Sequence, residues 1–188
     1  MNRREAINRV AIILGGSIIG ADFFLSGCNP DRNQVNDLFT ADDIAFLNEV
    51  AETILPETST PGAKAVNVGS FMAFMVQDCY TPKEQQVFIK GMAELQEQCK
   101  QRFGEKFMKL SAGQKNELLT SLDKTQKDAL KTQKPGDPLH YFRMMKELTL
   151  LGYFTSEVGC TKALRYVPVP GKYMGCIPYE KGDKAWAT

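Results

Sequence analysis

Histidine and tryptophan are the scarcest side chains in this chain of 188 residues, with one copy of each. A single histidine, His140, excludes the zinc-binding helix motif that needs two histidines four residues apart. We interpret His140 as a structural or surface residue near a helix start. No Cys-x-x-Cys-His segment is present, which excludes the usual attachment of c-type haem. No Gly-x-Gly-x-x-Gly follows a strand pattern, so no dinucleotide-binding fold is indicated. The sequence therefore predicts no catalytic, metal-ligating or cofactor-binding residues in this chain.

An excess of charge of either sign is also missing. Residues 1–27 hold three arginines and two acids, and without them 20 basic and 20 acidic side chains remain. Binding to nucleic acid needs a basic surface that neutralises phosphates. The balanced charge therefore argues against a nucleic-acid partner.

Long apolar runs are absent too. The longest run near the N-terminus covers residues 10–21 and ends at Asp22, whereas a membrane-spanning helix needs roughly 20 apolar residues. Arg3 and Arg4 precede this run, as in the signals of the twin-arginine export route, although Ala6 and Ile7 occupy the places where a Phe or Leu is usual. We predict an export signal over residues 1–27, with an uncleaved N-terminal anchor helix as the alternative.

A cysteine closes this stretch in the sequence Leu-Ser-Gly-Cys, which resembles a bacterial lipoprotein box. In that pattern the cysteine, here Cys28, becomes the first residue and receives acyl chains, and several chains together give stable anchoring. We therefore expect a periplasmic protein that is lipid-anchored to a bacterial membrane. Residues 28–37 are polar and are expected to form a tether between lipid and fold.

Strand-like alternation is lacking, whereas apolar residues recur at helical spacing over residues 38–166. Helix starts are indicated at Thr40, Thr81-Pro82, Ser111, Asp137-Pro138 and Thr155. The pattern predicts an all-α, single compact domain of about six helices. Two further sets are expected in its core: the stripe Tyr141, Met145, Leu148 and Leu151, and the methionines Met72, Met75, Met92, Met144 and Met145, for which an exposed partner surface is the alternative.

The C-terminal segment, residues 167–188, is rich in proline and glycine and has no helical or strand period. It nevertheless carries large apolar side chains. Tyr and Trp are enriched among the interface residues that contribute most of the binding free energy. Either this extended tail wraps back on its own domain or it packs on another protein. The candidate partner interface is Tyr173, Cys176, Tyr179 and Trp186.

Four cysteines follow Cys28, namely Cys79, Cys99, Cys160 and Cys176. An exported protein lies where disulfides persist, and four cysteines allow three pairings among which the sequence does not choose. For Cys176 we keep two candidates: a disulfide with Cys160, or a bond to a cysteine of a partner.

Two segments resemble the gluconate 2-dehydrogenase subunit 3 family: AETILPETSTPGAKAVNVGSFMAFMVQDCYT and LTLLGYFTSEVGCTKALRYVPVPGKYMGCIPY. The resemblance covers roughly residues 38–180 and includes the Leu-Pro-x-Thr-x-x-Pro-Gly-Ala loop and the Gly-Tyr-Phe-Thr-Ser segment. Members are small exported subunits of membrane-bound sugar and sugar-acid dehydrogenases.

The resemblance implies a non-catalytic small subunit that carries the export signal. Its partner would be a flavoprotein of the glucose–methanol–choline oxidoreductase class, which holds FAD and lacks a signal of its own. A cytochrome c subunit often accepts the electrons in such complexes. The lipoprotein box departs from other members, and the lipid here could replace a membrane-bound cytochrome. Two other hypotheses stay open: a free-standing helical envelope lipoprotein that binds a ligand or another protein, and an enzyme that uses surface carboxylates.

Overall fold

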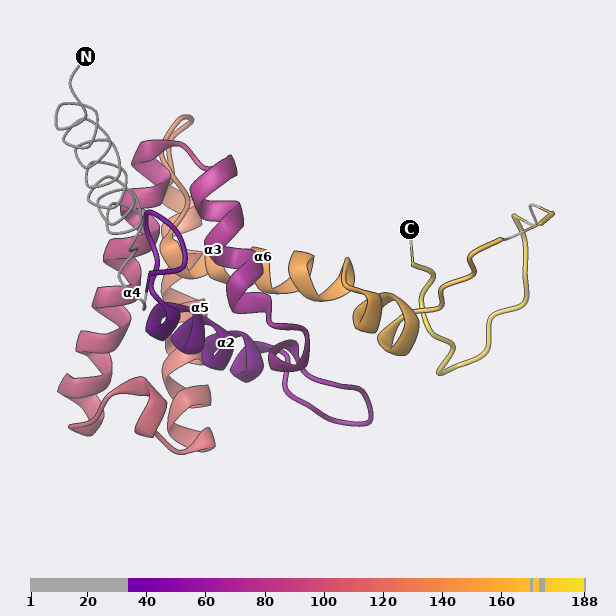
Figure 1. The fold of residues 1–188 in the computed structure, drawn as a ribbon, viewed down its shortest axis with the longest axis horizontal. Coiled ribbons are helices and arrows are strands. Elements are labelled where there is room, and N and C mark those ends of the chain that lie inside the picture. The colour runs from indigo at the N-terminus through magenta and orange to yellow at the C-terminus, as the bar shows by residue number, and fades with distance from the viewer. Residues whose placement is uncertain (1–33, 170, 173–174, 188) are drawn as a thin grey trace, which may run out of the picture. The chain divides into compact units, whose positions relative to one another are not determined.

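A computed structural model describes residues 34–169, 171–172 and 175–187. The predicted signal, with Arg3 and Arg4, the lipidation site Cys28 and the interface residue Tyr173 lie outside these ranges. The all-α fold predicted from the sequence is confirmed (Figure 1). The elements are α2 (Ala41–Ile54), η1 (Ala63–Val66), α3 (Val68–Cys79), α4 (Pro82–Phe103), η2 (Phe107–Lys109), α5 (Ala112–Thr132), α6 (Tyr141–Phe154) and the π-helical turn η3 (Gly159–Ala163).

Three helices begin where their capping sequences predicted. Thr40, Thr81 and Ser111 each accept a hydrogen bond from the backbone N–H three residues on. In each case the side chain at that third position bonds back to the backbone of the cap, which completes a capping box. These boxes satisfy amide groups that the first turn leaves unpaired, and so fix where α2, α4 and α5 start.

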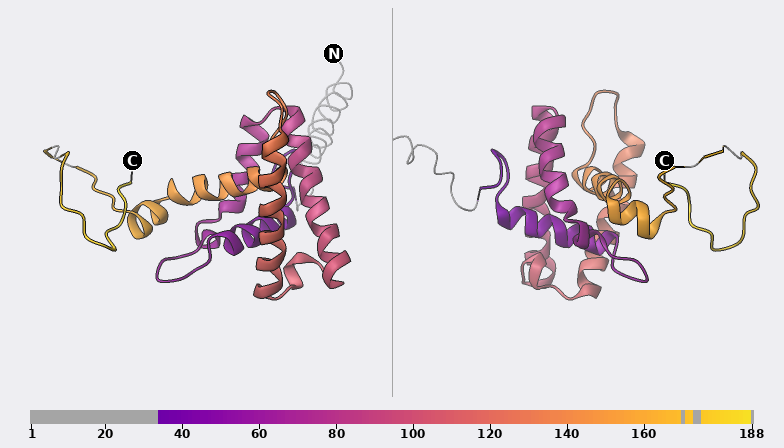
Figure 2. Two further views of the ribbon diagram at one scale, coloured as in Figure 1. Left: turned by 180° about the vertical axis from the view of Figure 1, so that it is seen from behind. Right: turned by 45° about the vertical axis from the view of Figure 1, so that its right-hand side comes forward.

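Helix α6 is the central element of the domain. It packs against α2, α3, α4 and α5. Figures 1 and 2 show α4 and α5 crossing it at a steep angle. The predicted methionine core is confirmed for Met72, Met92, Met144 and Met145, which are buried, and Met75 packs at the edge of the core.

Two glycines let the helices approach closely. A Cβ on Gly91 of α4 would overlap the ring of Tyr141 on α6. A Cβ on Gly69 of α3 would collide with the backbone of Ile44 on α2. A larger residue at either position forces neighbouring helices apart, so the two glycines set the spacing around α6 and α2.

Helix α6 begins later than the sequence indicated, at Tyr141 rather than at Asp137-Pro138. The preceding residues form a turn instead, in which the Asp137 N–H bonds to the Lys134 carbonyl and Gly136 has a φ of 87°. Glycine tolerates this left-handed conformation. The cap is His140, whose side chain accepts the Phe142 N–H, so the single histidine has the structural role assigned to it.

The end of α6 differs from the prediction in two ways. Leu151, expected on the buried stripe, is 46% exposed. Thr155, expected as the cap of the next turn, donates its hydroxyl to the Leu151 carbonyl, and Ser156 accepts the Gly159 N–H in its place. Leu151 is exposed because α6 extends past the helices that cover it, so that its last turn has no core on one side (Figures 1 and 2).

Candidate partner-binding surface

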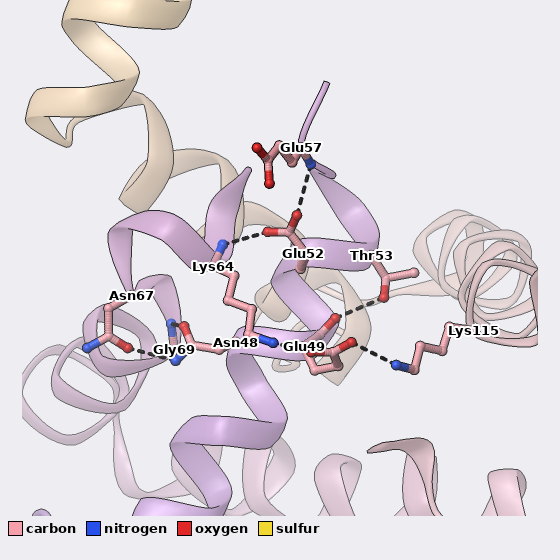
Figure 3. Close-up of polar contacts among 9 residues, drawn as sticks. All are labelled: Asn48, Glu49, Glu52, Thr53, Glu57, Lys64, Asn67, Gly69 and Lys115. Atoms are coloured by element: carbon pink, nitrogen blue, oxygen red, sulfur yellow. Dashed lines mark hydrogen bonds and ion pairs between the residues drawn. The ribbon is translucent and has the colours of Figure 1, made fainter. Parts of the chain in front are cut away.

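The loop between α2 and α3, residues 55–67, is irregular but is held by side chains of α2. The Glu52 carboxylate accepts the Glu57 N–H at 2.9 Å on one oxygen and the Lys64 N–H at 2.8 Å on the other (Figure 3). One carboxylate thus joins both ends of the loop. A Cβ on Gly62 would overlap this carboxylate, so glycine leaves the room that the carboxylate needs.

A second polar side chain fixes the junction between the loop and α3. The Asn48 Oδ1 accepts the Gly69 N–H at 2.7 Å, and its Nδ2 donates to the Asn67 Oδ1 at 2.7 Å (Figure 3). Asn67 lies in the left-handed region with a φ of 52°. Asparagine tolerates this conformation better than most residues, so Asn48 and Asn67 together turn the chain into α3.

Glu49 forms an ion pair with two lysines from different parts of the chain. It bonds Lys115 of α5 at 2.7 Å and Lys64 of loop 55–67 at 2.9 Å (Figure 3). The hydrogen bond from Lys115, followed by that from Lys64, lowers the pKa of Glu49 below its ordinary value. Lys115 is nearly buried, so Glu49 is its compensating charge. The pair therefore ties the loop, α2 and α5 together.

Helix α6 also holds the loop. The Tyr153 hydroxyl donates to the Pro61 carbonyl at 2.6 Å, across 92 positions of sequence. With these ties in place, the loop tip around Glu57–Ser59 stays exposed. Figures 1 and 2 show this loop on the same side of the domain as the C-terminal end of α6.

That end of α6 exposes three large apolar side chains, Leu150, Leu151 and Phe154, which we call the apolar end of α6. They are within five residues of each other in the last part of α6, and this end of the helix extends past the bundle in Figures 1 and 2. Exposed apolar groups that gather at one place on a surface are typical of interaction sites.

The tail continues this apolar character. Its exposed large side chains are Val167, Val169, Ile177, Tyr179 and Trp186, and Tyr166 just before it is exposed as well. Its far end returns to Arg165, with the Arg165 N–H bonded to the Ala185 carbonyl and the guanidinium 4.4 Å from the centre of the Trp186 ring. The Lys184 ammonium also reaches the Lys162 carbonyl. Between these points the described residues are exposed, so the tail forms an arc that closes on itself near Arg165 rather than covering the helical core.

The residues predicted for the interface have different surroundings. Tyr179 is 77% exposed, whereas Trp186 stacks on Arg165 of its own chain. Cys176 is exposed and Cys160 is half-buried, and both are free thiols. The Cys160 thiol donates to the Phe154 carbonyl at 3.1 Å. The two pairings considered for Cys176 stay predictions.

Sequence patterns did not reveal two parts of this surface. The acids and amides of α2 that hold the loop look like ordinary polar positions of an amphipathic helix. Of the apolar end of α6, Leu151 was interpreted as part of the core stripe, and Leu150 and Phe154 were not assigned. A signal for this second part was present, because Leu150 and Phe154 add apolar residues outside the face that Met145 and Leu148 define.

The described ranges contain no group of three or more His, Cys, Asp or Glu side chains placed to hold a metal ion. Within the same ranges, none of the helices combines the length and apolar character needed to cross a bilayer.

Comparison with known proteins places this surface in a family. A family model described as gluconate 2-dehydrogenase subunit 3 matches residues 41–171, which span loop 55–67, all of α6 and the start of the tail. No curated protein and no solved structure matches the sequence. Because the family model covers well over half of the chain, the resemblance seen in the two sequence segments is confirmed: the chain belongs to the gluconate 2-dehydrogenase subunit 3 family.

Proposed function

We propose that this chain is a non-catalytic small subunit of a flavin-dependent, gluconate 2-dehydrogenase-like oxidoreductase. It carries the export signal of the complex, and it assembles, stabilises and anchors the catalytic flavoprotein at the membrane. The flavoprotein is of the glucose–methanol–choline oxidoreductase class and holds the FAD. A cytochrome c subunit is a candidate further member of the complex. Arg3 and Arg4 direct export of the folded pair, and acyl chains on Cys28 retain it on the periplasmic side of a bacterial membrane.

The observation that carries this proposal is the surface formed by loop 55–67, the apolar end of α6 and the tail. Its parts lie on one side of the domain and fall largely within the stretch that defines the family. Three apolar side chains at this end of α6 remain partly exposed to water. They are 37–46% exposed, so burying the remainder of each against a partner contributes roughly 1 kcal/mol, and together they favour association. The flavoprotein is therefore the natural cover for this surface.

The test is purification of the tagged subunit from its native membrane, followed by measurement of flavin absorbance per mole of subunit. Leu151→Asp places a charge in the apolar end of α6 and is expected to lower co-purified flavin at least tenfold. Met108→Asp is the matched control, because Met108 is 47% exposed, as Leu151 is at 46%, but lies in η2 at another part of the domain. Flavin retained equally by both variants contradicts the assigned surface, and a wild-type subunit that brings no flavoprotein contradicts the function itself.

A further inference from the structure

A groove of about 430 Å³ lies between α4, the end of α5 and the start of α6, away from loop 55–67. Its apolar wall includes Val87, Leu130, Pro138 and Leu139. Its polar lining includes Glu94, Gln126 and Tyr141. The proposed function makes no use of this groove.

Gln126 is the unusual residue of the groove. It is 2% exposed, and its Oε1 has no hydrogen-bond partner among the described residues. Buried acceptors of this kind are rare because an unmet hydrogen bond costs about 1–3 kcal/mol. A buried amide oxygen without a donor in the described residues leaves a place for one from a water molecule or from a ligand.

The orientation of this amide is fixed by its neighbour. The Gln126 Nε2 donates to the Asp123 Oδ1 at 3.2 Å. Hydrogen bonds from Lys127 and then from Lys146 lower the pKa of Asp123 to about 2, so this carboxylate is ionised and can only accept. Exchanging the amide oxygen and nitrogen would set two acceptors against each other. The oxygen must therefore remain the unpaired atom, and what it lacks is a donor.

The groove holds further acceptors. Glu94 lines it with its carboxylate, and the Tyr141 hydroxyl donates to the Glu94 Oε1 at 3.4 Å. Asp137 adds a second acid to the lining. Two basic residues also line the groove: Arg143, which donates to Glu147 at 2.5 Å, and His140, whose pKa is lowered by burial so that its neutral form is favoured. This balance disfavours anions and favours a cation with several N–H donors.

We propose that this groove binds a primary ammonium group carried on an apolar stem. The ammonium donates to the Gln126 Oε1 and to the Glu94 carboxylate, and the stem lies against Val87, Leu130 and Leu139. A primary ammonium has three donors, which matches a site rich in acceptors, and a short alkyl chain matches the apolar wall. Either a free alkylamine or the lysine side chain of a protein supplies this chemistry.

The probe is n-pentylammonium, titrated at constant ionic strength into the ¹⁵N-labelled full chain and followed by NMR. We expect saturable shifts of the Gln126 side-chain amide and of the Leu130 and Tyr141 backbone amides. The neutral analogue n-pentanol and the anion pentanoate are expected to bind at least tenfold more weakly. Equal binding of n-pentanol, or shifts that do not saturate, would overturn the proposal.

Two variants and one control complete the test. Glu94→Gln removes the charge at an exposed position that the fold tolerates, and Gln126→Leu removes the buried acceptor; each is expected to weaken binding at least fivefold. Glu97→Gln is the matched control, because it makes the same change on α4 at a carboxylate that Gln101 bonds outside the groove. Unchanged affinity in Glu94→Gln overturns the proposal. A Gln126→Leu chain that is more stable than the unaltered chain and binds n-pentylammonium equally well also overturns the proposal. That result would mean that a trapped water, and not the ligand, bonds the Gln126 Oε1 in the unaltered chain.

A last comparison distinguishes the two sources of the ammonium group. Tighter binding of 1,5-diaminopentane than of Nα-acetyl-lysine methylamide supports a free amine as the ligand, and the reverse order supports a lysine side chain. Both results support the site, whereas failure of both ligands to compete with n-pentylammonium contradicts it. Neither result depends on flavoprotein binding, so this proposal and the proposed function can fail separately.

Discussion

Loop 55–67 and the tail from Val167 are both irregular and both carry proline and glycine, yet the domain holds them very differently. Side chains of α2 and α6 bond the loop at both ends and in the middle, through Glu52, Asn48 and Tyr153. The tail is bonded to the domain near Arg165 and leaves its apolar groups exposed. Composition predicts that a segment is not a helix, but only the surrounding side chains decide whether it is rigid.

The difference suits the proposed role. A loop that is already held in one conformation loses little conformational entropy when a partner binds, which favours a precise contact. A tail with few ties can extend over a larger surface at a higher entropic cost. We infer that the loop sets the orientation of the flavoprotein, while the tail adds contact area.

The largest expected effect comes from Glu49→Gln, which removes the charge that compensates Lys115. Taking one partner from a largely buried ion pair costs about 3 kcal/mol. We expect the free energy of unfolding, measured by urea denaturation, to fall by about that amount. Glu105→Gln is the control, because its pair with Lys109 is exposed and 3.6 Å long and should contribute less than about 0.5 kcal/mol. A loss as small as that of the control would mean that the pair does not hold the loop.

The next effect comes from Asn48→Ala, which removes the acceptor of the Gly69 N–H and the donor to the Asn67 Oδ1. An unmet buried donor costs about 2 kcal/mol, and the loop should loosen. Limited trypsin digestion measures the cleavage rates of the loop and the tail in one experiment. In the unaltered chain we expect cleavage in the tail, at Lys172 and Lys181, before cleavage in the loop at Lys64. Asn48→Ala should make cleavage after Lys64 faster without changing the cleavage rate in the tail. An unchanged cleavage rate after Lys64 would contradict a loop held rigid by Asn48.

A low pH is expected to destabilise the helical domain and loop 55–67 more than the tail. The pKa of Glu49 is lowered by Lys115 and Lys64, and that of Asp123 falls to about 2 through Lys127 and Lys146. A lowered folded-state pKa contributes stability that is complete above the ordinary values of 4.5 and 3.8 and is lost as the pH falls through the folded value. The melting temperature should therefore decrease from about pH 4.5 downward. Glu49→Gln should show a shallower decrease, and an identical slope would exclude Glu49 as a contributor.

The sequence predicted the helices well where a short-range signal marked their ends. The capping boxes at Thr40, Thr81 and Ser111 act within four residues, so they can be recognised without the fold. The start of α6 was misplaced because Asp137-Pro138 looks like a helix start, while the left-handed turn at Gly136 and the His140 cap depend on the path of the chain.

The candidate surface was predicted only in part. The exposed Tyr179 agrees with a tail that carries apolar groups in water. The contacts of Glu49 with Lys115 and of Tyr153 with Pro61 span 66 and 92 positions, and no periodicity in the sequence reports pairs so far apart. Leu151 was misplaced for a related reason: periodicity shows which side of a helix is apolar, but not where the neighbouring helices stop.

The smallest expected effect on stability, and a large one on assembly, comes from deleting residues 167–188. The deletion removes the hydrogen bonds near Arg165 and the stacking of its guanidinium on Trp186, and an exposed interaction of that kind contributes about 0.5–1 kcal/mol. The free energy of unfolding should fall by no more than about 1 kcal/mol, and the helical circular dichroism should persist, because the tail covers little of the core. Flavoprotein co-purified per mole of subunit should fall at least tenfold. The single change Trp186→Ala separates the two roles: it removes the stacking on Arg165 while keeping the backbone hydrogen bonds there and Tyr179, so it should cost less flavoprotein than the deletion does. A shortened chain that unfolds would show that the tail stabilises its own domain, and one that keeps its flavoprotein would remove the tail from the interface.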